Sequence, residues 1–232
     1  MIRLALILSL SFPVVALAGP WPREVGETFL SLSGEHNRAG NAYGALYVEH
    51  GLTPRTTLGI EIGRADQAET SAIVWLQRAL DDGQGPNRFA LQSGAGVIRR
   101  GDDVLPVVQG SLSWGRGFNR WGGGWLTAQV LGKMTGRGAD PREPVRPSFA
   151  ASFLTAERVV KTDLTLGLRP RDGLMVINSL WLEERQDEAF SARLMSSVVL
   201  DAPGPVQIEL GMVHPVSGPA ERAFRLGTWI EF

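Results

Sequence analysis

The end of the chain constrains its fold more than any other stretch. From residue 222 to residue 232 the sequence reads RAFRLGTWIEF, in which apolar residues alternate with mostly polar or small ones. In an extended strand Phe224 and Leu226 point to one side, whereas Arg225 and Glu231 point to the other. This period of two predicts a β-strand with one apolar face and one polar face.

The same alternation recurs along the chain in segments of about ten residues, separated by turn residues. About twelve such segments can be counted, so we expect an all-β chain that closes into an antiparallel, up-and-down barrel. The clearest hairpin in the first half turns at Pro54, because proline fixes φ at a tight reversal. The expected strands lie near residues 27–36, 41–52, 55–65, 70–80, 88–98, 104–115, 121–134, 160–169, 173–184, 190–200, 206–212 and 222–232.

The first 18 residues have the features of a secretory signal peptide. Arg3 precedes an apolar run from Leu4 to Val15, and the small residues Ala16 and Ala18 flank Leu17 as they do before a cleavage site. We therefore expect residues 1–18 to be removed and residues 19–232 to form one domain. No later segment reaches the roughly 20 apolar residues that a membrane helix needs.

Composition excludes several classes of site. The chain contains no cysteine, so neither disulfide bonds nor thiolate chemistry can contribute. Its 23 basic and 24 acidic side chains give a net charge of −1, which does not point to nucleic acid as a partner. No cluster of metal-ligand residues appears, and the glycine-rich stretch at residues 115–124 lacks the strand-to-helix setting of a phosphate loop. Neither a metal nor a cofactor is expected.

Two stretches resemble known membrane proteins. The terminal strand that ends on Phe232 resembles the last strand of bacterial outer-membrane β-barrels, where the aromatic end serves as an assembly signal. The run LTPRTTLG at residues 52–59 is similar to small Gram-negative outer-membrane proteins of the kind grouped with uptake channels. The resemblance implies a transmembrane barrel in the cell outer membrane, with membrane lipids and the barrel-assembly machinery as partners. A soluble sandwich or calyx shows the same alternation and is the alternative fold.

The lengths of the connections predict that the two ends of the barrel differ. If both chain termini face the periplasm, the short turns near residues 53, 81, 117, 170 and 201 share that side, and the long connection at residues 135–157 lies outside. Short periplasmic turns and longer external loops are typical of outer-membrane barrels. Tryptophans near strand ends, such as Trp21 and Trp229, suit interfacial belts, and some of these aromatic residues are expected to pack inside instead.

Alternation also predicts which charged side chains face the interior of the barrel. Both signs occur there, so these side chains either line a narrow aqueous passage or form ion pairs that plug the lumen. The candidate pore-lining residues are Glu61, Lys161, Asp163, Arg169, Arg193, Glu209, Arg225 and Glu231.

Catalytic candidates are few, because the chain has only three histidines. The stretch HPVSG at residues 214–218 can be compared with outer-membrane phospholipase A, in which the catalytic serine follows its histidine by two residues on the same strand face. Here Ser217 follows His214 by three residues, Pro215 lies between them, and the asparagine that follows the serine in that family is missing. A catalytic serine and its histidine base must lie within hydrogen-bonding distance, and this spacing departs from the one that achieves it. We therefore expect a rim loop here, and we predict no catalytic residue.

The number of strands limits the width of the interior. Twelve strands lie between the eight-stranded barrels that side chains fill and the 16-stranded porins that leave a channel. A narrow channel or uptake protein for a small solute is therefore the favoured function. A lipid-modifying enzyme of the phospholipase or deacylase type and a structural barrel with a plugged lumen are the alternatives.

Overall fold

The computed structural model describes residues 19–38, 40–65, 69–136, 157–186, 189–218 and 221–232. The expected signal peptide and most of the long connection lie outside these residues. The described residues form twelve β-strands and one short 3-10 helix, η1 (Arg120–Gly122). The strands are β1 (Thr28–Asn37), β2 (Ala42–Thr53), β3 (Thr56–Ala65), β4 (Glu69–Ala79), β5 (Asn87–Arg100), β6 (Asp103–Phe118), β7 (Gly124–Thr135), β8 (Glu157–Arg171), β9 (Leu174–Arg185), β10 (Ser191–Asp201), β11 (Val206–Ser217) and β12 (Ala223–Glu231).

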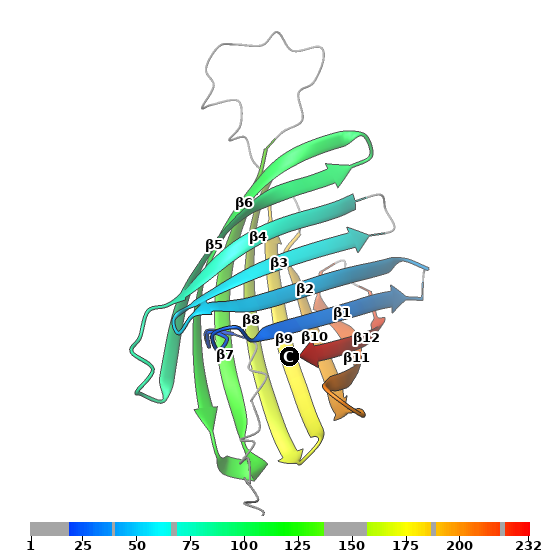
Figure 1. Ribbon diagram of the computed structural model, residues 1–232. Coiled ribbons are helices and arrows are strands. Elements are labelled where there is room, and N and C mark those ends of the chain that lie inside the picture. The colour runs from blue at the N-terminus through cyan, green and yellow to red at the C-terminus, as the bar shows by residue number, and fades with distance from the viewer. Residues whose placement is uncertain (1–18, 39, 66–68, 137–156, 187–188, 219–220) are drawn as a thin grey trace, which may run out of the picture.

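The strands form one closed antiparallel barrel in which each strand pairs with its neighbours in sequence (Figure 1). Closure comes from β1, which pairs with β2 on one side and with β12 on the other. Beyond β12, the backbone of Phe232 continues the seam: its carbonyl accepts a hydrogen bond from Thr28 N at 2.7 Å, and its N–H donates to Thr28 O at 3.0 Å. Because the barrel is closed, no sheet edge is left with unpaired backbone N–H and C=O groups, for which lipid offers no hydrogen-bonding partner. The expectation of a closed twelve-stranded barrel is confirmed.

The wall separates two environments, as the alternation predicts. Large apolar side chains stay exposed on the outer surface of strands all around the barrel, for example Leu32 on β1, Val74 on β4 and Leu226 on β12. Their sequence neighbours point inward and are mostly buried, such as Ser33 and Trp75. An apolar exterior around a closed barrel is the arrangement of an outer-membrane β-barrel. Within the described residues, no helix is long and apolar enough to cross a bilayer.

The barrel has two ends, which we call proximal and distal. The proximal end carries residues 19–27, the C-terminal residue Phe232 and the turn between β2 and β3, whereas the connection from β7 to β8 leaves from the distal end (Figure 1). The predicted turn after Leu80 also lies at the proximal end, where the Asp81 carboxylate accepts hydrogen bonds from Gly83 N at 2.9 Å and Phe89 N at 2.6 Å. Burial raises the pKa of Asp81, but these backbone donors outweigh it and lower the pKa below its ordinary value.

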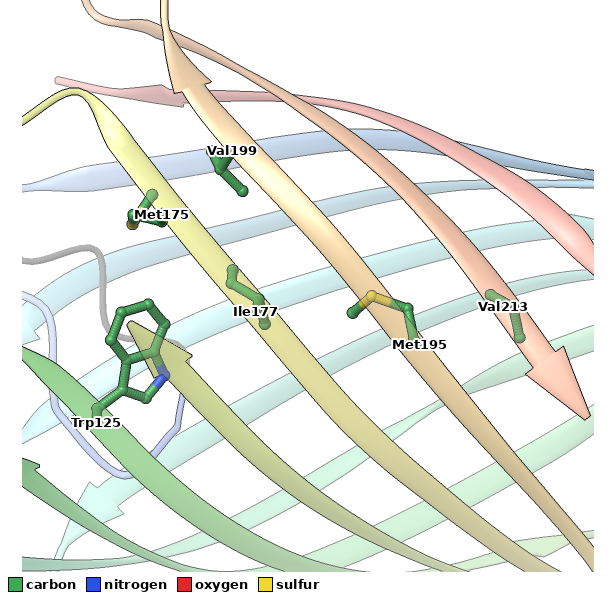
Figure 2. Packing of buried hydrophobic residues seen from close by; sticks show 6 residues of the cluster. All are labelled: Trp125, Met175, Ile177, Met195, Val199 and Val213. Atoms are coloured by element: carbon green, nitrogen blue, oxygen red, sulfur yellow. The ribbon is translucent and has the colours of Figure 1, made fainter. Parts of the chain in front are cut away.

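The inside of the barrel is partly filled by apolar side chains. One cluster contains Trp125 on β7, Met175 and Ile177 on β9, Met195 and Val199 on β10 and Val213 on β11, and Figure 2 shows their places on these strands. A second cluster contains Ile73, Trp75, Ile98 and Val107, with Tyr47 packed against it. Trp21 and Trp229 pack against the first cluster, so these two tryptophans belong to the interior packing rather than to an interfacial belt.

Candidate functional site

A polar cavity of about 590 Å³ lies inside the distal half of the barrel, and we call it the vestibule. Its walls come from strands on opposite sides of the barrel, including β1 to β5 and β7 to β10. Charged side chains of both signs line it, with Lys161, Arg193 and Glu183 on one side and Glu35 and Glu61 on the other. A hollow of this size could hold a small polar molecule.

Glu183 on β9 is the centre of the ion pairs on the β8–β10 wall. Its carboxylate is 3.2 Å from Lys161 Nζ, contacts Arg185 Nε, and is 3.9 Å from Arg193 Nη2. The Arg193 guanidinium also lies 5.3 Å from the centre of the Trp181 ring, a cation–π geometry. Asp163 on β8 also borders the vestibule and interacts electrostatically with Lys161 and Arg193, so this wall carries charges of both signs.

On the opposite wall, the charges are paired more completely. Arg225 on β12 is 2.8 Å from Glu35 Oε1 and 3.2 Å from Glu209 Oε2, so it joins β12 to both of its neighbours, β1 and β11. Glu209 is only 2% exposed. Arg100 pairs with Glu69 at 2.7 Å near the distal rim. The buried charge of Glu209 is tolerated because Arg225 is its cationic, hydrogen-bonding partner.

The eight candidate pore-lining residues occupy different levels of the barrel. Five of them border the vestibule, namely Glu61, Lys161, Asp163, Arg193 and Arg225. The other three lie elsewhere: Glu209 is paired with Arg225, Glu231 is paired with Arg23, and the Arg169 guanidinium lies 5.6 Å from the centre of the Trp125 ring.

Below the vestibule, inward-facing polar side chains are packed against one another rather than exposed to water. Ser111 Oγ donates a hydrogen bond to Gln92 Oε1 at 2.8 Å, and Gln129 Nε2 donates to Ser111 Oγ at 2.8 Å. Thr57 is 1% exposed and Ser197 is 3% exposed. Side chains that line an open aqueous pore would keep contact with water, so the described part of the lumen is occluded in this state.

The residues before β1 cause much of this occlusion, because they enter the proximal mouth of the barrel. Arg23 is 6% exposed, and Pro20 is also fully buried. The Arg23 guanidinium pairs with Glu49 Oε2 at 2.5 Å and with Glu231 Oε1 at 2.7 Å. Burial lowers the pKa of Arg23, but the carboxylates of Glu49 and Glu231 outweigh it and raise the pKa above its ordinary value. The sequence predicts an extended lead-in here, and nothing in its pattern shows that it turns into the lumen.

The possible catalytic pair is not assembled. His214 and Ser217 both belong to β11, so the expectation of a rim loop is wrong: ladder pairing with β10 continues to Ser217 past a register shift at Ala192 and Arg193. Within the part of the chain that the structure describes, no hydrogen bond joins His214 to Ser217. The same part of the chain contains no group of three or more His, Asp or Glu side chains that could hold a metal ion.

No protein-family model and no curated protein sequence matches this chain. Solved structures do match it. The NanC porin has a TM-score of 0.60 at 9% identity, covering 87% of this chain and 98% of that one. The KdgM porin has a TM-score of 0.56 at 9% identity, covering 88% of this chain and 99% of that one. A second structure of KdgM, in complex with disordered oligogalacturonate, has a TM-score of 0.56 at 8% identity, with coverages of 88% and 99%.

The shared property is the fold. Both porins match over nearly their whole length, so this chain has the architecture of a small outer-membrane porin with no large added domain among its described residues. Identities of 9% do not carry over individual residues, and the vestibule has to be interpreted from its own side chains.

Proposed function

We propose that this protein is a narrow uptake channel for a small polar solute in the outer membrane. The vestibule carries this proposal, because it places a charged cavity of about 590 Å³ inside the distal half of a membrane barrel. A barrel built only for structure has no need of such a hollow, and apolar side chains could fill it as they fill the lower lumen. The porin fold of NanC and KdgM supports the proposal, and the oligogalacturonate complex of KdgM shows that a barrel of this shape can hold a polar solute.

The ion pairs indicate which side chains would meet the solute. Arg193 is partly exposed, and its 3.9 Å approach to Glu183 is too long for a tight ion pair, so its charge remains available in the vestibule. Arg225, in contrast, is held by two carboxylates. We therefore assign Arg193 to solute contact, and Arg225 to support of the wall.

Planar-bilayer recording tests the channel. We expect small, discrete conductance from the purified protein, and we expect Arg193→Gln to shift the ion preference toward cations by removing a fixed positive charge. Arg78→Gln is the matched control, because Arg78 is exposed on the outer face of β4. Conductance that is absent from wild type and from both variants, in every membrane and voltage tried, would instead support a structural barrel with a plugged lumen.

The proposal includes the absence of lipid hydrolysis. The structural reason is that Ser217 follows His214 by three residues on β11 and no hydrogen bond joins the two side chains, so His214 does not activate Ser217. The purified protein should release no fatty acid from phospholipid or lipopolysaccharide, with or without calcium. Release that disappears in both His214→Ala and Ser217→Ala would show that the barrel is an enzyme.

A further inference from the structure

Residues 19–27 are bound by the barrel without being part of its wall. The Gly19 carbonyl accepts a hydrogen bond from Gln77 Nε2 on β4 at 3.2 Å. The Arg23 N–H donates to Thr57 Oγ1 on β3 at 2.9 Å, and Gly26 N donates to Gly51 O on β2 at 2.9 Å. With the Arg23 ion pairs to β2 and β12, the segment contacts strands on several sides of the proximal mouth (Figure 1).

The wall is shaped to receive this segment. At Gly115 on β6, an added Cβ would lie 2.5 Å from the Trp21 ring and 2.8 Å from Pro20 Cγ. At Gly51 on β2, it would lie 1.8 Å from the Glu24 carbonyl oxygen. Both glycines let the backbone or the rings of the segment approach more closely than any other residue type permits. The fit is therefore a specific one between the segment and the strands around it.

Arg23 provides the strongest attachment. Its guanidinium bridges Glu49 on β2 and Glu231 on β12, and it lies 4.4 Å from the centre of the Phe29 ring. Arginine suits this position because its planar fork can donate to two carboxylates at once while its face stacks on a ring. Removing one partner from a buried ion pair leaves an uncompensated charge, which strongly destabilises the buried arrangement.

Apart from this attachment, the segment is held by packing of Pro20 and Trp21 and by a few hydrogen bonds, not by a strand ladder. Pro20 and Pro22 have no N–H to donate, and backbone pairing with β2 is limited to the two hydrogen bonds that Gly51 exchanges with Gly26 and Glu27. Each strand, in contrast, is held along its length by pairing on both sides. The segment could therefore leave the lumen without any strand separating from its neighbours.

We propose that residues 19–27 form a plug that closes the proximal mouth of the lumen, that Arg23 is its latch, and that the discrete openings expected of the wild-type channel occur when the plug transiently withdraws. This inference rests on the proposed channel function. It also predicts a property that does not depend on conductance: the side chains beneath the plug become accessible to water when the latch is removed.

The first experiment uses a reversible lock, which is possible because the chain has no cysteine of its own. The pair Arg23→Cys and Thr57→Cys removes the latch and places two thiols where the Arg23 N–H meets the Thr57 side chain at 2.9 Å. We expect the oxidised double variant to be closed in bilayers and the same protein to conduct after reduction. Thr57→Cys alone keeps the latch, so it should behave like wild type with or without reductant.

Two results of this experiment would overturn the plug. If the disulfide forms and the oxidised protein conducts as well as the reduced one, the segment does not obstruct the path, although the channel function stands. If no disulfide forms and a water-soluble maleimide labels both cysteines of the double variant as fast as an exposed cysteine, residue 23 does not occupy the proximal mouth.

The second experiment distinguishes failure of the plug from failure of the channel. Thr127 on β7 is buried beneath the segment, since an added Cβ at Gly19 would lie 2.7 Å from Thr127 Cγ2. We expect a small, water-soluble maleimide to label Thr127→Cys at least about tenfold faster when Arg23→Gln is also present, because the buried latch is lost. Lys161→Cys in the vestibule should be labelled equally in both backgrounds, since it lies outside the plug.

The two readouts together separate the possibilities. Equal protection of Thr127→Cys with and without Arg23→Gln would overturn the latch, whatever the bilayers show. Faster labelling together with silent bilayers would support the plug and contradict the channel. Heated and unheated gel mobility of each variant, compared with wild type, shows that the barrel itself has formed.

Discussion

At the scale of single residues, two tryptophans depend on glycines in the neighbouring strand. Trp75 on β4 is paired in register with Gly59 on β3, and Trp125 on β7 is paired with Gly167 on β8. An added Cβ would lie 2.0 Å from the Trp75 ring at Gly59 and 2.2 Å from the Trp125 ring at Gly167. Each indole therefore lies flat against the wall, over a glycine that has no side chain. The ring fills part of the lumen and covers the glycine backbone.

This packing predicts that Gly59→Ala and Gly167→Ala each lower the free energy of unfolding by roughly 1–3 kcal/mol, because the indole must move in a filled interior. Gly132→Ala is the control, since nothing lies within 4 Å of its added Cβ. Urea titration of the folded barrel in detergent, followed by tryptophan fluorescence, measures the difference. Equal stability of all three variants would show that the interior around the indoles is loosely packed.

Two arginines of the vestibule are expected to respond differently to the same substitution. Arg225 is held by Glu35 and Glu209, whereas Arg193 has a long contact to Glu183 and a cation–π contact with Trp181. We expect Arg225→Gln to destabilise the barrel by about 3 kcal/mol, because it leaves buried carboxylates without a partner, and we expect a smaller change from Arg193→Gln. Thermal unfolding of both variants in detergent checks this order, and the reverse order would contradict the assignment of Arg225 to wall support.

At the scale of elements, the seam between β1 and β12 decides whether the barrel closes. Phe232 contributes to the seam through its backbone, which exchanges two hydrogen bonds with Thr28. Its side chain is 71% exposed on the outside and takes no part in closure. The aromatic ring and the terminal backbone therefore have separable roles, the ring being available for recognition by the assembly machinery.

This separation predicts different outcomes for two changes at the same position. Phe232→Ala should reduce the amount of protein in the outer membrane while leaving refolding into detergent micelles unchanged, because the backbone bonds persist. Deletion of Phe232 should impair both, since the hydrogen bonds to Thr28 are also lost. The comparison is made by membrane fractionation of cells and by the gel shift of refolded protein, with deletion of Ala139 in the long connection between β7 and β8 as the control. If Phe232→Ala reaches the membrane at wild-type levels, the ring is not an assembly signal.

At the scale of the whole molecule, an apolar exterior encloses charged and packed interior side chains. Such a barrel is stable in lipid or detergent because closure satisfies its backbone hydrogen bonds. We expect the protein to fractionate with the outer membrane and to migrate faster unheated than heated on denaturing gels. Recovery from the periplasm as a soluble protein would contradict the membrane assignment, since an exterior this apolar should not remain in water.

The sequence by itself determined the architecture. A period of two fixes which side chain of each strand points outward, and turn residues such as Pro54 and Gly101 mark where the strands reverse, so both the strand number and the position of Phe232 at the closing seam could be predicted. The orientation of Lys161, Asp163 and Arg193 toward the interior followed from the same local rule. These properties depend only on neighbours in the chain.

Only the tertiary structure decided which side chains contact one another inside the barrel. Whether Arg225 meets Glu35 depends on closure of the barrel, because the two lie at opposite ends of the sequence on β12 and β1. The lead-in around Arg23 has no alternation to indicate its place, and its binding in the proximal mouth depends on Glu49, Glu231 and the space left by Gly115. The alternation of apolar and polar residues along a strand indicates which face of the wall each residue occupies. Contacts across the lumen, in contrast, exist only after twelve strands have closed around it.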